Sequence, residues 1–84
     1  MTRKELKAAF AEAKENKCGI CVEIQMPGQK TNELIINDWS ALDVKLEYYL
    51  KAYDKNLVHS MNDRIKIVDI YPCEYYHPKF KGDK

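Results

Sequence analysis

Three cysteines and two histidines are the residues of this 84-residue chain that could hold a metal ion. Cys18 and Cys21 form a Cys-x-x-Cys pair, and Cys73 precedes His77 by four residues. Thiolates and imidazole suit zinc, and both spacings are permitted. A zinc knuckle needs its paired cysteines on one tight turn, whereas Cys18 ends a predicted helix and Cys21 lies within a predicted strand. We therefore expect small apolar cysteines and no metal ligands, and keep a small structural zinc protein as the third hypothesis.

We find no residue pattern in this chain that is typical of a catalytic site. A redox dithiol places its first cysteine at a helix N-terminus, but here the helix precedes the pair, so the dipole is reversed. His59 and His77 have only Ser60 and Cys73 as sequence-local candidates for a nucleophile. We expect no catalytic residue, no cofactor and no enzymatic activity.

Aromatic and basic residues offer a binding chemistry instead. Aromatic rings stack on bases, while Arg and Lys neutralise phosphate, so a mixture of the two is typical of a nucleotide or single-strand site. Tyr, Trp and Arg also dominate the energetics of protein interfaces. Taken individually, the aromatic residues are typical of side chains that are partly buried in the core. The lysines are typical of a solvated surface. The predicted ligand-binding residues are Trp39, Arg64, Lys66, Tyr71, Tyr75 and Tyr76.

Composition narrows the class of partner. Fourteen Lys and Arg against thirteen Asp and Glu give a net charge of +1, which argues against a bulk duplex-DNA binder. No apolar run approaches the roughly 20 residues of a membrane-spanning helix. An odd number of cysteines without an export signal favours the reducing cytoplasm over a disulfide framework. A chain this short has a thin core, so we expect a homodimer or higher homo-oligomer.

The first part of the chain changes from a helical to a strand period. Thr2 and Glu5 match a capping box, which predicts a helix over about Arg3 to Asn16 that stops near Gly19. From Ile20 to Met26 apolar residues alternate with polar ones, as in a half-buried strand. Its return strand is expected over Glu33 to Asn37, after a loop from Pro27 to Asn32.

The second part repeats the order of helix and hairpin. Asp38 or Ser40 starts a helix whose apolar face carries Leu42, Leu46, Tyr49, Leu50 and Tyr53. A short strand over Leu57 to Met61 and a turn at Asn62-Asp63 then lead into a final strand. That last strand runs from Arg64 to Tyr71, with a bulge or two-sided burial near Val68, and Pro72 ends it.

These elements predict an α+β fold in a single domain over residues 1–84. Two helices pack on one face of a small, mainly antiparallel sheet, in the order α-β-β-α-β-β. Residues 79–84 contain a glycine and three lysines and are expected to fray.

The stretch Lys45-Leu46-Glu47-Tyr48-Tyr49-Leu50-Lys51-Ala52-Tyr53, continued by Asp54 to Leu57 and Arg64 to Ile67, resembles small accessory proteins encoded by phages and prophages. The resemblance covers about the second half of the chain. It implies an anti-defence protein of the anti-CRISPR or nucleotide-sponge type, acting in the host cell cytoplasm. No functional residue is carried over, because no family motif is shared.

Two functional hypotheses follow besides the zinc protein. The first is a non-enzymatic binder that sequesters a host immune signalling nucleotide in a Lys/Arg and Tyr-lined pocket. The second is an anti-CRISPR-like inhibitor that binds a host defence protein through exposed tyrosines and a sheet edge.

Overall fold

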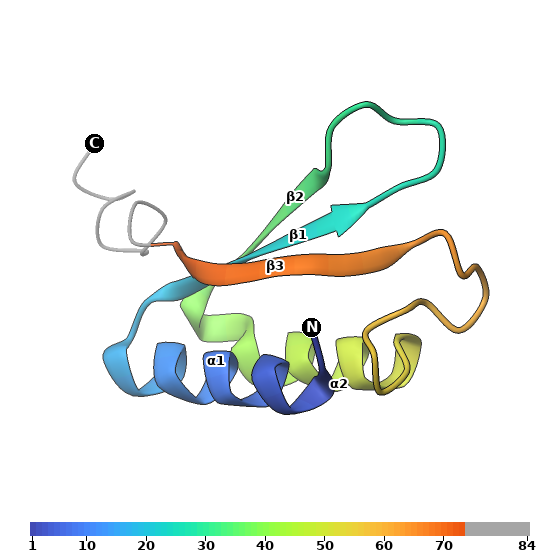
Figure 1. Cartoon of the computed structure of the whole chain (residues 1–84). Coiled ribbons are helices and arrows are strands. Elements are labelled where there is room, and N and C mark those ends of the chain that lie inside the picture. The colour runs from blue at the N-terminus through green and yellow to red at the C-terminus, as the bar shows by residue number, and fades with distance from the viewer. Residues whose placement is uncertain (74–84) are drawn as a thin grey trace.

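The computed structural model describes residues 1–73 as two helices on one face of a three-stranded sheet (Figure 1). The elements are α1 (Arg3–Asn16), β1 (Gly19–Gln25), β2 (Glu33–Asn37), the short 3-10 helix η1 (Trp39–Ala41), α2 (Leu42–Ala52) and β3 (Lys66–Cys73). The sheet order is β2-β1-β3, and both pairs are antiparallel. The predicted α+β class is confirmed.

The α1 helix begins at the predicted capping box and ends before the predicted stop. The Thr2 hydroxyl accepts from the Glu5 amide, and the Glu5 carboxylate accepts from the Thr2 amide at 2.9 Å. At the other end Lys17, rather than Gly19, adopts the left-handed conformation with φ of 56°. Gly19 serves a different purpose, because a Cβ there would stand 2.7 Å from the Asn37 carbonyl oxygen. It therefore permits the close approach of β1 and β2.

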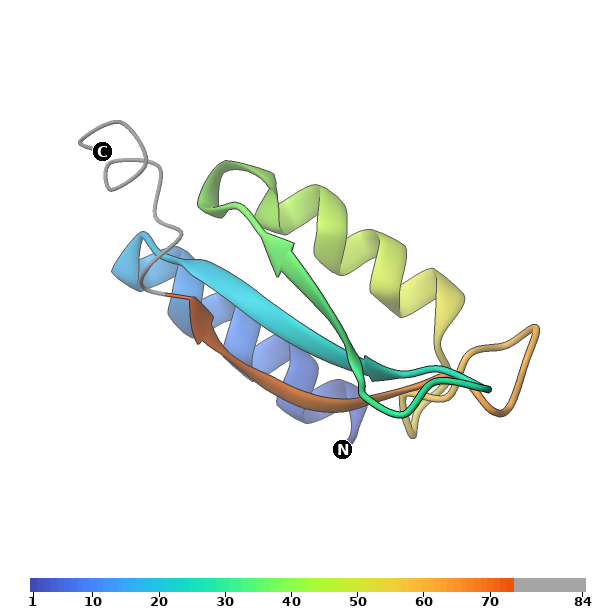
Figure 2. The same ribbon diagram turned by 90° about the horizontal axis from the view of Figure 1, so that it is seen from above.

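The core lies between the helices and the face of the sheet that they cover. The predicted alternation in β1 is confirmed, since Ile20, Val22 and Ile24 are buried on this face. Their buried neighbours include Leu6, Phe10, Ala13, Leu42, Tyr49, Tyr53, Leu57 and Ile67. Figure 2 shows α1 running beneath β1 and β3, with α2 beside β2.

Asn37 ties the end of β2 to α2 inside this core. Its side chain is fully buried, its Nδ2 donates to the Ile20 carbonyl at 3.2 Å, and its Oδ1 accepts from the Tyr49 hydroxyl at 3.2 Å. Burial raises the pKa of Tyr49. One buried amide thus satisfies a phenol and a strand carbonyl that would otherwise be costly to bury.

The N-terminal turn of α1 also caps α2. The Arg3 guanidinium donates to the carbonyl oxygens of Leu50 and Tyr53, the latter at 2.8 Å. These carbonyls belong to the end of α2, where no further helical amide can reach them. The cation therefore joins the beginning of one helix to the end of the other.

The third predicted strand, Leu57 to Met61, is wrong. This segment makes only the isolated bridges Tyr53↔His59 and Val58↔Lys66. The Asp54 carboxylate accepts from the amides of Asn56 and Val58, and Leu57 has a φ of 61°. Local side-chain bonds to the backbone hold the segment in turns rather than in a ladder.

The last strand begins and ends two residues later than predicted, running through Pro72 to Cys73. Proline is tolerated there because β3 is an edge strand. The expected bulge is confirmed: Ile24 pairs with Ile67 while Glu23 pairs with Asp69, leaving Val68 as the extra residue. The predicted frayed tail lies outside the described residues. Within residues 1–73, neither helix is long and apolar enough to cross a membrane.

Candidate functional site

The six predicted ligand-binding residues do not meet in one pocket. Arg64 and Lys66 lie together where β3 begins. Tyr71 lies near the other end of β3, and Trp39 belongs to η1 after β2. Tyr75 and Tyr76 lie outside the described residues. Of the four described residues, the structure brings together only the two cations.

The two cations line a polar hollow of about 440 Å³ at the turn between β1 and β2. The other lining residues are Gln25, Met26, Pro27, Gly28, Gln29 and Asp63. Gly28 has a φ of 80°, which suits the tight turn. The hollow offers amide and cationic donors to an anion, but the Asp63 carboxylate reduces its positive potential.

Trp39 lines a separate hollow of about 330 Å³ between the end of α1 and the start of α2. The Lys14 ammonium of this hollow is paired with the Asp43 carboxylate at 2.9 Å, in an exposed ion pair. Trp39 is half-buried and packs against the core, in line with its partial core role. The aromatic ring and the Arg64–Lys66 pair therefore belong to different surfaces.

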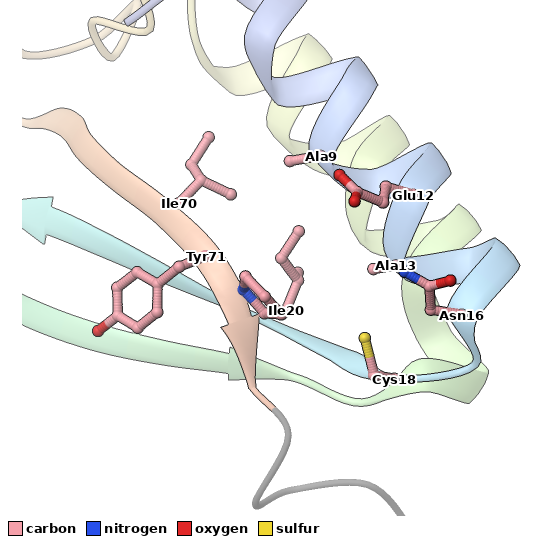
Figure 3. Close-up of a pocket in the computed structure, with 9 residues that line it drawn as sticks. Ala9, Glu12, Ala13, Asn16, Cys18, Ile20, Ile70 and Tyr71 are labelled. Atoms are coloured by element: carbon pink, nitrogen blue, oxygen red, sulfur yellow. The ribbon is translucent and has the colours of Figure 1, made fainter.

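A third hollow lies between α1 and the end of β3 (Figure 3). Its volume is about 150 Å³, enough for one apolar side chain. Ala9, Ala13 and Ile70 supply its apolar wall, and Glu12 and Asn16 add polar groups from α1. Cys18 also lines it, on the helix side of the sheet.

The cysteines do not form the zinc set. Cys21 and Cys73 are joined by a disulfide across β1 and β3, with Cα atoms 5.3 Å apart. The expectation of unlinked apolar cysteines is thus wrong for this pair, because the bulge in β3 turns Cys73 to the same face as Cys21. His77 lies outside the described residues, and residues 1–73 contain no cluster of three metal-ligating side chains.

The face of the sheet turned away from the helices combines exposed apolar side chains with a polar network. We call it the outer face; its residues are Cys21, Glu23, Gln25, Leu34, Ile36, Lys66, Asp69, Tyr71 and Cys73. Ile36, Cys21 and Tyr71 lie in one row across the three strands. Leu34 is 47% exposed and Ile36 is 37% exposed. Both helices are on the opposite face (Figure 1), so neither covers these side chains.

A polar network holds Tyr71 on the outer face. Its hydroxyl donates to the Glu23 carboxylate at 2.7 Å, and the Asn32 amide donates to the other oxygen of that carboxylate at 3.3 Å. The hydrogen bond to Glu23 raises the pKa of Tyr71. Tyr71 thus presents its ring beside apolar neighbours while its hydroxyl is already engaged. This arrangement suits contact with a protein better than stacking in a closed nucleotide pocket.

Sequence reasoning did not select Leu34 or Ile36. The signal was present as the apolar run Leu34-Ile35-Ile36, in which alternate residues must face opposite sides of a strand. The register with β1 decides which of them face outward, and here Leu34 lies opposite Glu23 and Ile36 opposite Cys21. The run therefore places two apolar side chains on the uncovered face.

No protein-family model, curated protein or solved structure matches this chain.

Proposed function

We propose that this chain is a non-enzymatic binding protein whose outer face docks a partner protein. The observation that carries the proposal is the exposure of Leu34 and Ile36 beside Tyr71, on the face that neither helix covers. Exposed apolar side chains that gather on one surface are typical of interaction sites. The proposal extends to the small phage-type anti-defence class, with inhibition of a host defence protein.

The side chains of the outer face indicate what kind of partner surface would complement it. Apolar side chains at the centre of an interface supply most of its free energy, at roughly 25 cal/mol per Å² of apolar surface buried. Glu23 and Asp69 lie side by side in the neighbouring row. A partner that presents apolar residues next to Lys or Arg therefore complements this face.

Affinity capture from host cells tests the proposal. We compare the unmodified protein with Leu34→Lys, which places a charge in the centre of the contact. The matched control is Met61→Lys, because Met61 is 85% exposed in a loop away from the outer face. Quantitative mass spectrometry should show proteins retained by the unmodified chain and the control but lost from Leu34→Lys. An identical set of captured proteins for all three would refute the proposal.

Sequestration of a signalling nucleotide is a second candidate function, favoured by the juxtaposition of Arg64 and Lys66 at one hollow. Exposed cations next to turn amides can hold a phosphate group. Isothermal titration with a panel of cyclic dinucleotides tests it, with Lys66→Ala as the variant and Lys4→Ala as the charge-matched control. Binding that is weakened in Lys66→Ala alone supports this function, and the absence of binding to the unmodified chain excludes it for these ligands.

A further inference from the structure

The outer face presents its side chains in two successive rows that differ in chemistry. The row nearer the end of β3 is apolar and aromatic, and across the three strands it contains Ile36, Cys21 and Tyr71. The next row places the exposed Leu34 beside two carboxylates, those of Glu23 and Asp69. A segment that covers this face must therefore supply apolar side chains to one row and cations to the other.

The chain returns to this face where its described part ends. Cys73 is the last residue of β3, and its disulfide joins it to Cys21 of the central strand on the outer face. Neighbouring strands lie about 4.8 Å apart, so β2 is only about 10 Å from the end of β3. The residues that follow Cys73 are therefore tethered beside the outer face, which gives them a high effective concentration there.

The sequence after Cys73 matches the two rows in type and in order. Tyr75 and Tyr76 come first, and Lys79 and Lys81 follow. Over residues 74–84, three lysines outnumber the two side-chain carboxylates. On the outer face the excess is opposite, because two carboxylates outnumber its one lysine, Lys66. The two surfaces therefore attract each other.

The segment is also long enough to reach both rows. An extended chain advances about 3.3 Å per residue, so Lys79 can lie up to about 20 Å from Cys73. Asp69 precedes Cys73 by four residues, which is about 13 Å along β3. The residues from Glu74 to Lys79 can therefore turn back and reach the carboxylates, and the two tyrosines pass over the nearer row on the way.

We propose that residues 74–81, which lie outside the described part of the chain, fold back over the outer face and cover it. The two tyrosines pack on the apolar row, and the two lysines lie beside the carboxylates. This contact limits the expected fraying to Gly82 and the residues after it. A second copy of the chain fits this face less well, because its own outer face has the same excess of carboxylates.

The consequence of this contact rests on the proposed function, because the segment occupies the face at which a partner protein would dock. Segment and partner then compete. The apparent affinity for the partner falls with the fraction of molecules in which the face is uncovered. The C-terminal segment is therefore an autoinhibitory contact.

Methyl resonances of the full chain, measured by nuclear magnetic resonance, test the contact without any partner. Aromatic rings shift the resonances of methyl groups on which they pack. Tyr75→Ser/Tyr76→Ser should therefore move the methyl resonances of Leu34 and Ile36 and leave those of the buried Leu6 in place. Tyr75→Phe/Tyr76→Phe is the matched control, since it keeps both rings and should keep the shifts. Outer-face resonances that do not move in the serine variant would overturn the proposal.

Charge reversal tests the second row. Lys79→Glu/Lys81→Glu should release the segment and move the same outer-face resonances, and adding Asp69→Lys should restore part of the contact. The control is Lys4→Glu/Lys7→Glu, which makes the same change at two exposed lysines of α1 on the helix layer. Equal effects of the two lysine pairs on the outer-face resonances would contradict the proposed contact. Circular dichroism of each variant confirms folding.

Partner capture tests the competition. Tyr75→Ser/Tyr76→Ser should retain several-fold more partner protein than the unmodified chain, because the face is uncovered in a larger fraction of molecules. A smaller amount would overturn the autoinhibitory contact, since the tyrosines would then belong to the partner interface. The methyl shifts are measured on the protein alone, so they test the segment independently of the partner. Capture that does not depend on Leu34 would refute the proposed function and leave the shifts unchanged.

Discussion

The two faces of the sheet are stabilised in different ways. On the helix-side face, Ile20, Val22 and Ile24 are buried beneath α1 and α2, and the hydrophobic effect holds the layers together. On the outer face, a disulfide and the Tyr71–Glu23 hydrogen bond connect β1 to β3, while Leu34 and Ile36 remain exposed. The disulfide and the hydrogen bond thus hold β1 and β3 together on this face without a covering layer. That leaves apolar surface for contact with another molecule.

Removal of the disulfide should have the largest effect on stability. The linked residues are 52 positions apart, and closing a loop of that length stabilises a fold by about 4 kcal/mol on the chain-entropy model. Cys21→Ala/Cys73→Ala should therefore lower the free energy of unfolding by several kcal/mol, as measured by urea denaturation. Reducing agent should produce a similar loss in the unmodified chain and none in the double variant. Equal stability with and without the bond would show that the outer face does not depend on it.

Truncating one leucine on each side of the sheet compares the two faces directly. Leu6 is fully buried beneath the sheet, so Leu6→Ala should cost about 2 to 5 kcal/mol. Leu34→Ala removes the same atoms from an exposed site and should cost no more than about 1 kcal/mol. Chemical denaturation of dilute protein measures both. Comparable losses would mean that the outer face is covered as completely as the core.

Loss of the buried Asn37 hydrogen bonds should have an intermediate effect on stability. Asn37→Leu would leave the Tyr49 hydroxyl and the Ile20 carbonyl without their amide partner. A buried polar group without a hydrogen bond costs about 1 to 3 kcal/mol. Adding Tyr49→Phe to this variant removes one of the two orphaned groups and should recover part of the loss. The four proteins form a double-mutant cycle, and additive losses would contradict a direct contact.

The titration of Tyr53 and Tyr71 should distinguish the two faces of the sheet. Of these tests, it involves the smallest change in stability. Burial raises the pKa of Tyr53 to about 12, whereas the hydrogen bond to Glu23 raises that of Tyr71. Because both values are higher in the folded chain, the associated stability is present below about pH 10 and is lost as the pH rises above it. Glu23→Gln should shift the ultraviolet titration of Tyr71 toward the ordinary value and leave that of Tyr53 unchanged. A shift of both residues would contradict the separate causes.

Local patterns in the sequence predicted where helices and strands occur better than they predicted which elements lie next to one another. The capping box of Thr2 and Glu5 and the alternation from Ile20 to Ile24 depend on nearby residues, and both are confirmed. The strand predicted from Leu57 to Met61 failed because the Asp54 carboxylate binds local amides and competes with ladder pairing.

The candidate site was only partly predictable, because it depends on register between distant strands. Arg64 and Lys66 are close in sequence and meet at one hollow, whereas Tyr71 lies farther along the outer face and Trp39 lines another hollow. The Cys21–Cys73 bond requires β3 to lie beside β1. No local periodicity in the sequence specifies that β3 pairs with β1, because the pairing of distant strands depends on the packing of the whole domain.

The extra residue in β3 acts as a change of phase in the alternation of side chains. Ile65 and Ile67 occupy odd positions, but beyond Val68 the even residue Ile70 takes over the core side. Tyr71 and Cys73 are therefore turned outward, where Cys21 lies. A one-residue deletion at Val68 would return the strand to regular pairing with every later side chain on its present face. With the present sequence, regular pairing through Val68 would instead turn Tyr71 and Cys73 inward, so the bulge determines whether the cross-link forms.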